Sequence, residues 1–521
     1  MKKLLPLLAV LTSLLACSPS DTLLPDPFSK RIPSPPEKLS SMDVLVSFEQ
    51  DRATCVTLVN GELPPPEVPG DYCPEGPGTP TAPLLYQTER RVRFYVDVLA
   101  IGSKGTYGAD FPITGNITLS LSSGTMVAGT PTRMEAGVVG RQRVVIKNAP
   151  GKVQLWSEAG TAMQLAGEAI PPTFSVGASD ALYFGQPNLP DVQRTPDDST
   201  SPLHGQRVTV EAGHLMVTRL AGNGFTVQDV SVPMVDGQPK WNGLFVFAFN
   251  GVDNLNVGAR LLKLRGAITS FQGMTQLAEP EYVTVGGECA PRREPSRFGR
   301  EPTESDEGES LVRARCPENA RCVDNRCVPA DEDFEYDRFG RTVCHAPNTC
   351  GTANAECPNG TYCDGRQDWR TVDRNGQPAQ TCQVCPTVVT GELWTTPGRS
   401  PWCGPIFSGD AFLAEKLRNE ALEGALLQVR DAVVAGLDLD NDFFRSGFEG
   451  YGQWKLTLPD GQCATVVSDV APGFNVLAAQ AARQRLESFT GTLRQVRFNS
   501  GSAFWMLDLR HKDDLVLAPT P

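Results

Sequence analysis

Hydrophobic and polar residues alternate with a period of two in several short segments of this chain. In 92–98, valine and phenylalanine alternate with arginine, tyrosine and aspartate, and similar alternation occurs in 117–121 and 153–155. This period is typical of strands with one buried face. Glycine and proline separate the segments at short intervals, without an amphipathic helix of ordinary length between them. We therefore predict a β-sandwich over residues 41–185.

The sandwich region contains one stretch that is similar to a known family. Residues 111–121, Phe-Pro-Ile-Thr-Gly-Asn-Ile-Thr-Leu-Ser-Leu, resemble bacterial Ig-like repeats, and the resemblance implies an Ig-like sandwich. Cys55 and Cys73 flank a proline-rich loop and are expected to pair with each other. They lack the Cys…Trp…Cys pattern of antibody domains.

A second β-rich pattern begins after residues 186–204, whose proline, aspartate and serine content predicts a linker. Short glycine-containing segments recur at 213–218, 222–229, 242–247, 257–258, 264–266 and 271–277. Their order resembles the OB-fold modules that accompany bacterial extracellular nucleases, most distinctively in Gly273-Met-Thr-Gln-Leu277. The resemblance implies an OB-like domain at 205–288, in which glycine permits the sharp bends of a small barrel.

A weaker copy of this pattern lies near the C-terminus. Residues 423–429 repeat the first-strand pattern, and 485–493 align with 260–268. An internal repeat of this kind predicts a second OB-like domain at 408–516. The alanine-rich segment 475–487 is expected to form its helix.

The N-terminal segment 1–17, MKKLLPLLAVLTSLLAC, combines two lysines, a short apolar run and a cysteine. It resembles the lipoprotein signal peptide and lipobox of bacterial lipoproteins, which implies cleavage before Cys17 and lipidation of Cys17. The apolar run is too short for a membrane span, and a buried N-terminal helix is the alternative. Residues 18–40 then read as a proline-rich and serine-rich tether. Ser18 replaces the aspartate that retains such proteins at the inner membrane, so the resemblance favours the outer membrane of a Gram-negative cell.

Cysteine usage agrees with an exported chain. The sequence has 15 cysteines, and 15 − 1 leaves 14 besides Cys17, enough for seven disulfides. Eleven of them lie between 289 and 403, which predicts a disulfide-rich insert of low secondary structure at 289–407. Cys382 and Cys385 form a CxxC, for which structural disulfides are favoured over a zinc or redox site, since a second CxxC is missing.

The acidic loop at 438–449 is the best metal candidate. Asp438, Asp440, Asp442 and Glu449 occupy positions 1, 3, 5 and 12 of an EF-hand-like calcium loop, but Phe443 stands where that loop needs glycine. A solvated acidic loop is the favoured interpretation, and calcium is the alternative cofactor. No other cofactor is indicated.

Charge argues against general binding of nucleic acid. The net charge is −13, and residues 205–285 hold six basic and six acidic side chains, 6 − 6 = 0. Arg260, Lys263 and Arg265 nevertheless cluster, and Phe225 or Trp241 could stack on a base or a sugar, so these five are the candidate ligand residues. Phe245, Phe247 and Phe249 alternate with Val246 and Ala248, which is more typical of a barrel core.

Catalytic motifs are missing from the sequence. The four histidines fall in none of the known hydrolase, metalloprotease or nuclease patterns, and glycine-rich phosphate loops are missing too. The sequence thus predicts a mainly β protein, with an N-terminal Ig-like β-sandwich, two OB-like β-barrels and a Cys-rich insert between the barrels. We expect a membrane-anchored, non-enzymatic binding or structural scaffold for envelope protein or polysaccharide. The alternative is an OB-fold accessory protein that binds extracellular nucleic acid for a separate nuclease.

Overall fold

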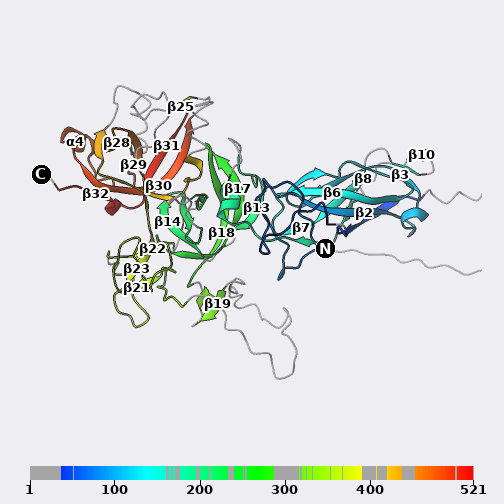
Figure 1. The fold of residues 1–521 in the computed structure, drawn as a ribbon, viewed down its shortest axis with the longest axis horizontal. Coiled ribbons are helices and arrows are strands. Elements are labelled where there is room, and N and C mark those ends of the chain that lie inside the picture. The colour runs from blue at the N-terminus through cyan, green and yellow to red at the C-terminus, as the bar shows by residue number, and fades with distance from the viewer. Residues whose placement is uncertain are drawn as a thin grey trace, which may run out of the picture.

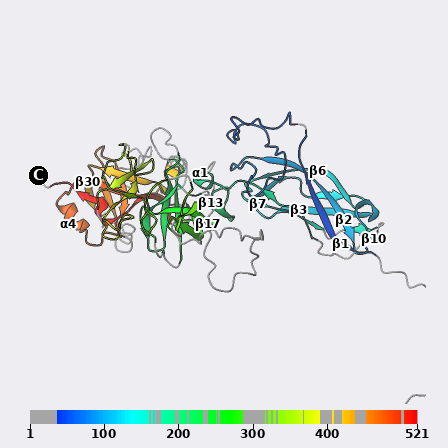
Figure 2. The same cartoon turned by 90° about the horizontal axis from the view of Figure 1, so that it is seen from below.

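Strands provide most of the regular structure, and they form three larger units and a smaller one. The computed structural model describes residues 37–50, 52–159, 163–165, 168–169, 176–194, 200–210, 212, 214–232, 240–249, 252, 255–286, 316, 320–323, 326–330, 333–352, 354–366, 368–389, 406–407, 419–436, 452–498 and 502–519. An N-terminal sandwich and two barrels follow one another along the long axis, with a Cys-rich module beside the barrels (Figures 1 and 2). The prediction of a mainly β protein is confirmed.

The N-terminal unit consists of two main sheets around one core. One sheet has the order β1-β2-β6-β4, and the other has the order β10-β9-β3-β8-β11 with β5 on β3; β7 and β12 form a small ribbon. The strands are β1 (Leu39–Ser47), β2 (Val92–Gly102), β3 (Ile113–Leu121), β4 (Thr125–Ala128), β5 (Thr132–Met134), β6 (Val138–Lys147), β7 (Lys152–Val153), β8 (Leu155–Ala159), β9 (Gln164–Leu165), β10 (Glu168–Ala169), β11 (Val176–Ala178) and β12 (Leu182–Tyr183).

The alternation in the sequence accounts for this core. Phe94 and Val96 of β2 and Ile117 and Leu119 of β3 are buried in one cluster between the sheets. The predicted strands at 92–98 and 117–121 are therefore confirmed. The predicted pair Cys55–Cys73 is also present, with the two Cα atoms 5.8 Å apart. The assignment of this unit to an Ig-like fold remains a prediction.

The segment predicted as a linker, 186–204, contains a short helix that packs into the core of the first barrel. Helix α1 (Leu189–Gln193) starts with a capping box between Asn188 and Asp191, and Leu189 and Val192 are buried in the core of the first barrel. Asp191 also accepts a hydrogen bond of 3.1 Å from the backbone N–H of Thr88 in the sandwich, and burial raises the pKa of its carboxyl. The polar composition of this segment predicted a linker, although two apolar residues within it have helical spacing.

Two barrels follow, and each has six principal strands. Barrel 1 consists of β13 (Arg207–Val210), β14 (Leu215–Ala221), β15 (Gly224–Asp229), β16 (Gly243–Phe247), β17 (Arg260–Phe271) and β18 (Met274–Thr284). Barrel 2 consists of β26 (Leu426–Arg430), β27 (Val433–Gly436), β28 (Gln453–Thr457), β29 (Cys463–Val467), β30 (Leu486–Phe498) and β31 (Ser502–Leu509), and β24 (Thr387–Val388), β25 (Ile406–Phe407) and β32 (Leu515–Leu517) pair at its margins.

The two barrels have the same connectivity. In barrel 1, β17 pairs with β13 and β18, and β16 lies parallel to β18; in barrel 2, β30 pairs with β26 and β31, and β29 lies parallel to β31. The register agrees as well, because Gly266 lies opposite Val208 and Gly491 lies opposite Leu427. The predicted alignment of 260–268 with 485–493 is therefore confirmed.

Barrel 2 also contains helix α4 (Val476–Ala481), inside the segment predicted to be helical at 475–487. The Asn475 side chain accepts a hydrogen bond from the N–H of Ala478 at the helix start. The helix is shorter than predicted, because Arg483 has a positive φ of 49° and strand β30 begins at Leu486.

The Cys-rich module contains β19 (Ala320–Val323), β20 (Arg326–Pro329), β21 (Val343–Cys344), β22 (Thr361–Asp364) and β23 (Gln380–Val384). Its disulfides are Cys316–Cys327, Cys344–Cys363, Cys350–Cys385 and Cys357–Cys382. Four of these cysteines, Cys344, Cys357, Cys363 and Cys382, form a buried cluster of their own. Cys322 and Cys463 are disulfide-bonded too. The prediction of a disulfide-rich region is confirmed.

The barrels pack closely against each other. A Cβ atom on Gly243 would lie 2.2 Å from the carbonyl carbon of Gly424, so the two backbones meet where a side chain is missing. The N–H of Trp241 donates to the carbonyl of Ala421 at 2.6 Å, and the N–H of Leu426 donates to Gln228 Oε1 at 3.0 Å. These contacts hold the outer faces of the barrels at a fixed distance.

Candidate ligand-binding cleft between the two barrels

Two sets of sequence-predicted site residues lie outside the described part of the chain. One is the lipidation site Cys17. The other is the acidic loop of Asp438, Asp440, Asp442 and Glu449. Both therefore remain predictions.

The five candidate ligand residues of barrel 1 do not form one surface. Phe225 and Arg260 are fully buried, Trp241 and Lys263 are half-buried, and Arg265 is exposed. The Phe225 ring packs edge to face on Tyr282 inside the barrel, with the ring centroids 5.3 Å apart. A ring in that position cannot stack on a ligand unless the core opens.

Two of the three basic residues in this set, Arg260 and Arg265, have partners within the protein. Arg260 donates a hydrogen bond of 3.3 Å to the Tyr336 hydroxyl of the Cys-rich module, and the Arg265 guanidinium lies 3.7 Å from Glu281. Arg260 therefore joins two parts of the fold, and this cluster offers no continuous basic groove.

The three phenylalanines of 245–249 correct the sequence interpretation. Leu244 and Val246 are fully buried in the barrel core, whereas Phe245 and Phe247 point to the other face of β16 and are only partly buried. Phe249 is 87% exposed. Both faces of this strand are apolar, and the smaller aliphatic side chains fill the narrow barrel.

Phe245 and Phe247 line a cleft between the two barrels, with a volume of about 630 Å³. Barrel 1 contributes a phenylalanine wall, which also includes Phe271 and Met274, together with five polar side chains. Barrel 2 contributes five further polar side chains with Leu493, Val496 and Met506. The polar lining comprises Arg219, Asn223, Thr226, Gln272, Gln276, Gln453, Asp469, Thr492, Arg494 and Asp508.

An ion-paired network crosses this cleft. Arg219 of barrel 1 donates from Nε to the carbonyl of Leu509 at 3.0 Å, and its guanidinium lies 3.3 Å from Asp469 and 3.6 Å from Asp508 of barrel 2. Arg494 Nε lies 2.5 Å from Asp508. Two arginines thus face two aspartates, so the charges in the cleft balance.

Three polar atoms of residues at the barrel 2 wall have no hydrogen-bond partner among the described residues, namely Gln453 Nε2, Arg494 Nε and Asp508 Oδ1. Arg494 Nε lies in the ion pair with Asp508, so Gln453 Nε2 and Asp508 Oδ1 are the two without any partner among these residues. Both residues are 3% exposed, and their side chains lie on the outer face because Trp454, Leu507 and Leu509 fill the barrel core. A buried polar group without a partner costs about 1–3 kcal/mol. Each atom exposes less than 1 Å², so it can bond to a ligand only when its side chain turns toward the cleft.

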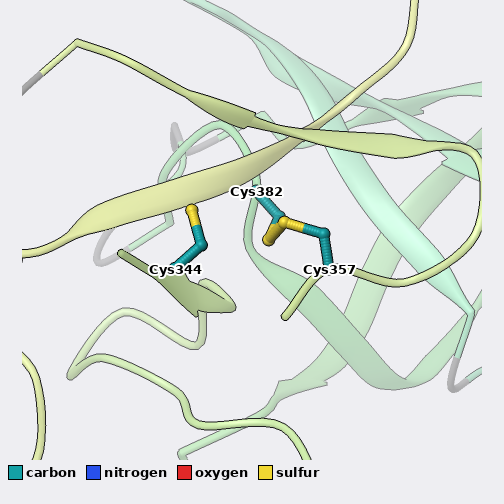
Figure 3. A group of neighbouring side chains, drawn as sticks. All are labelled: Cys344, Cys357 and Cys382. Atoms are coloured by element: carbon teal, nitrogen blue, oxygen red, sulfur yellow. A yellow bond between two sulfur atoms is a disulfide. The ribbon is translucent and has the colours of Figure 1, made fainter. Parts of the chain in front are cut away.

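The cysteine cluster of the module is the one group of metal-ligand type found among the described residues. The Sγ atoms of Cys344, Cys357 and Cys382 lie within 4.8 Å of one another. All three sulfurs are in disulfides, and the Cys357–Cys382 bond is visible in Figure 3. Metal ligation needs thiolates, so this oxidised cluster is a structural core.

Sequence reasoning missed the cleft residues, although a local signal exists for two of them. Arg219 lies in the apolar strand Leu215–Ala221, and Asp508 lies between Leu507 and Leu509. A single charge inside an apolar strand indicates an outward position with a partner. The partner itself could not be identified, because Arg219 and Asp508 are far apart in the sequence.

No family model matches the chain, and neither the curated proteins nor the solved structures contain a match. Among the described residues, helices long and apolar enough to cross a membrane are not found. The role of the cleft must therefore be inferred from its own residues.

Proposed function

We propose that this protein is an exported, lipid-anchored scaffold that binds a protein or polysaccharide of the cell envelope without catalysing a reaction. The observation that supports binding most directly is the cleft of about 630 Å³ between the two barrels. Small-molecule and polymer subsites are commonly concave, mostly apolar and equipped with a few fixed polar groups. Phe245 and Phe247 would supply the apolar contact, and Arg219 and Asp508 would supply the fixed polar floor.

The chemistry of the cleft supports binding over catalysis. A nucleophile or general base needs a neighbouring group that activates it. The carboxylates of Asp469 and Asp508 are instead paired with Arg219, and the described histidines do not line the cleft. These contacts favour a fixed recognition surface.

The nucleic-acid alternative receives less support from the cleft. The principal strands of each barrel include a parallel pairing, and the OB folds that the sequence resembles often bind single strands. However, a groove for phosphates needs an excess of positive charge. The two arginines here are balanced by two aspartates, so we place envelope polymers first.

The anchor rests on the sequence of 1–17 and would place the scaffold on a membrane, with the outer membrane expected in a Gram-negative cell. Metabolic labelling with palmitate tests it. The full chain should incorporate the label and fractionate with membranes, and Cys17→Ser should do neither. Membrane retention of Cys17→Ser at the level of the unaltered chain would contradict the anchor.

The binding role can be tested by filling the cleft. Gly222 lines the cleft, and a Cβ atom placed there meets nothing within 4 Å. Gly222→Trp should therefore fold and abolish retention of solubilised envelope material on the immobilised protein. The matched control is Gly473→Trp, because a Cβ at Gly473 also meets nothing within 4 Å and this residue does not line the cleft. Equal retention by both variants would contradict the proposal.

A further inference from the structure

We infer that the cleft binds a neutral sugar unit of an envelope polysaccharide. This inference rests on the proposed binding function and narrows its ligand. It follows from three properties of the same space, namely the unused hydrogen-bonding atoms, the phenylalanine wall and the balanced charge.

The unused atoms determine the polar chemistry of the ligand. Gln453 Nε2 can only donate a hydrogen bond, and the Asp508 carboxylate oxygen Oδ1 can only accept one; both are buried without a partner among the described residues. A hydroxyl group both donates and accepts. A ligand with several hydroxyls can therefore satisfy both atoms once the two side chains turn toward the cleft, and a purely apolar side chain would leave both unsatisfied.

The opposite wall determines the apolar chemistry. Phe245 and Phe247 are two residues apart on β16, so their side chains share one face of the strand. The face of an aromatic ring is electron-rich, and it attracts the weakly positive C–H groups on the face of a sugar ring. A sugar presents such a face together with hydroxyls at its edge, which matches a phenylalanine wall with polar side chains beside it and opposite it.

Charge and size exclude two other classes of ligand. Arg219 and Arg494 both contact Asp508, so free cations for an acidic sugar or a phosphate are not available in the described lining. The volume of about 630 Å³ lies within the range of about 300–1,000 Å³ typical of small-ligand sites. A globular protein partner instead needs a surface of about 800 Å² on each side.

A fractionation experiment tests the ligand class on the full chain. Solubilised envelope material is divided and treated with periodate, which cleaves the vicinal diols of sugars, with protease, or with nuclease. Each sample is then quenched and passed over the immobilised protein, with Gly222→Trp as the blocked control. We expect periodate alone to abolish retention.

The other outcomes separate the two levels of the proposal. Retention that is lost with protease or nuclease and survives periodate overturns the sugar inference and leaves a binding function in the cleft. Retention that is equal for Gly222→Trp, or missing throughout, overturns the proposed function and the inference with it.

A variant of Gln453 provides a second test, which distinguishes a ligand-binding role of this residue from a purely structural one. Gln453→Met removes the unpartnered amide, so the melting temperature should rise, while the affinity for a panel of neutral oligosaccharides of glucose, galactose, mannose and N-acetylglucosamine should fall about tenfold. Gln428→Met is the matched control, because Gln428 Nε2 donates to Thr490 Oγ1 at 3.0 Å outside the cleft. It should lower stability and leave affinity unchanged. An unchanged affinity of Gln453→Met for every sugar that the unaltered chain binds, or no binding by that chain, would overturn the inference.

Discussion

Barrel 1 and barrel 2 share their strand connectivity and differ on their outward faces. At the parallel pairing of each barrel, Val246 lies opposite Leu277 and Val466 lies opposite Leu507, and all four side chains are fully buried. The outward neighbours in β16 are phenylalanines, whereas Thr465 and Val467 occupy the equivalent places in β29.

This difference shows that inward-facing residues maintain the fold, whereas outward-facing residues form the candidate site. The inward positions must fill a small barrel, so similar aliphatic residues recur in both copies. The outward positions are free of that requirement. Barrel 1 has an aromatic wall on the outward face of β16, and barrel 2 contributes Gln453 of β28 and Asp508 of β31, so the cleft needs both copies.

The largest expected effect concerns the glycine that both copies share. A Cβ on Gly491 would lie 2.2 Å from the Asp508 carbonyl oxygen, and one on Gly266 would lie 2.5 Å from that of Ala278. Gly491→Ala should lower the free energy of unfolding by about 3 kcal/mol, since overpacking against backbone cannot relax easily. Denaturant unfolding followed by the fluorescence of buried Trp454 measures it.

The same substitution in the other barrel tests whether the copies are equivalent. Gly266→Ala should have a similar cost, and Gly473→Ala, where a Cβ has open space, should stay within about 0.5 kcal/mol of the unaltered chain. A harmless Gly491→Ala would show that the close strand crossing does not constrain barrel 2.

A smaller effect is expected for the arginine that joins the barrels. Removing one partner of a buried ion pair costs about 3–5 kcal/mol, and because Asp508 keeps its contact with Arg494 we expect about 2 kcal/mol for Arg219→Met. In calorimetry, the melting temperatures of the two barrels should also differ more in Arg219→Met than in the unaltered chain. Arg207→Met is the control, because its pairs with Glu279 and Glu281 are exposed and such pairs contribute about 0–1 kcal/mol. Equal losses for both variants would contradict the bridging role.

The smallest effect on stability is expected on the outward face itself. Replacing Phe245 and Phe247 by the barrel 2 residues, Phe245→Thr with Phe247→Val, should cost less than about 1.5 kcal/mol, because both side chains lie outside the core. Val246→Ala, which leaves a cavity in the core, should cost about 2–3 kcal/mol. Urea unfolding of the two variants compares them, and a greater loss for the double variant would place the phenylalanines in the fold's core.

Local sequence patterns were sufficient to predict much of this architecture. The strands β2 and β3, the pair Cys55–Cys73, the disulfide-rich module and the repeat of 260–268 at 485–493 all follow from alternation or spacing. These features depend on neighbours in the chain or on a pattern that occurs twice.

The remaining features depend on contacts that no local pattern contains. Period-two alternation shows that Phe245 and Val246 face opposite ways, but where both are apolar it does not show which one faces the core. The packing of α1 was not predicted, because polar residues surround Leu189 and Val192 in the sequence. The cleft brings Arg219 to Asp469 and Asp508, and that arrangement follows only from the docking of the two barrels.

The central claim is that the cleft between the barrels binds the ligand through its phenylalanine wall. The most direct test is calorimetric titration of the retained envelope polymer into Phe247→Ala and Phe249→Ala. Phe247 lines the cleft, whereas Phe249 does not line it and is 87% exposed. We predict that Phe247→Ala weakens binding at least tenfold, a loss of about 1.4 kcal/mol, and that Phe249→Ala leaves it unchanged. Equal affinities for the two variants, or a greater loss for Phe249→Ala, would contradict the account.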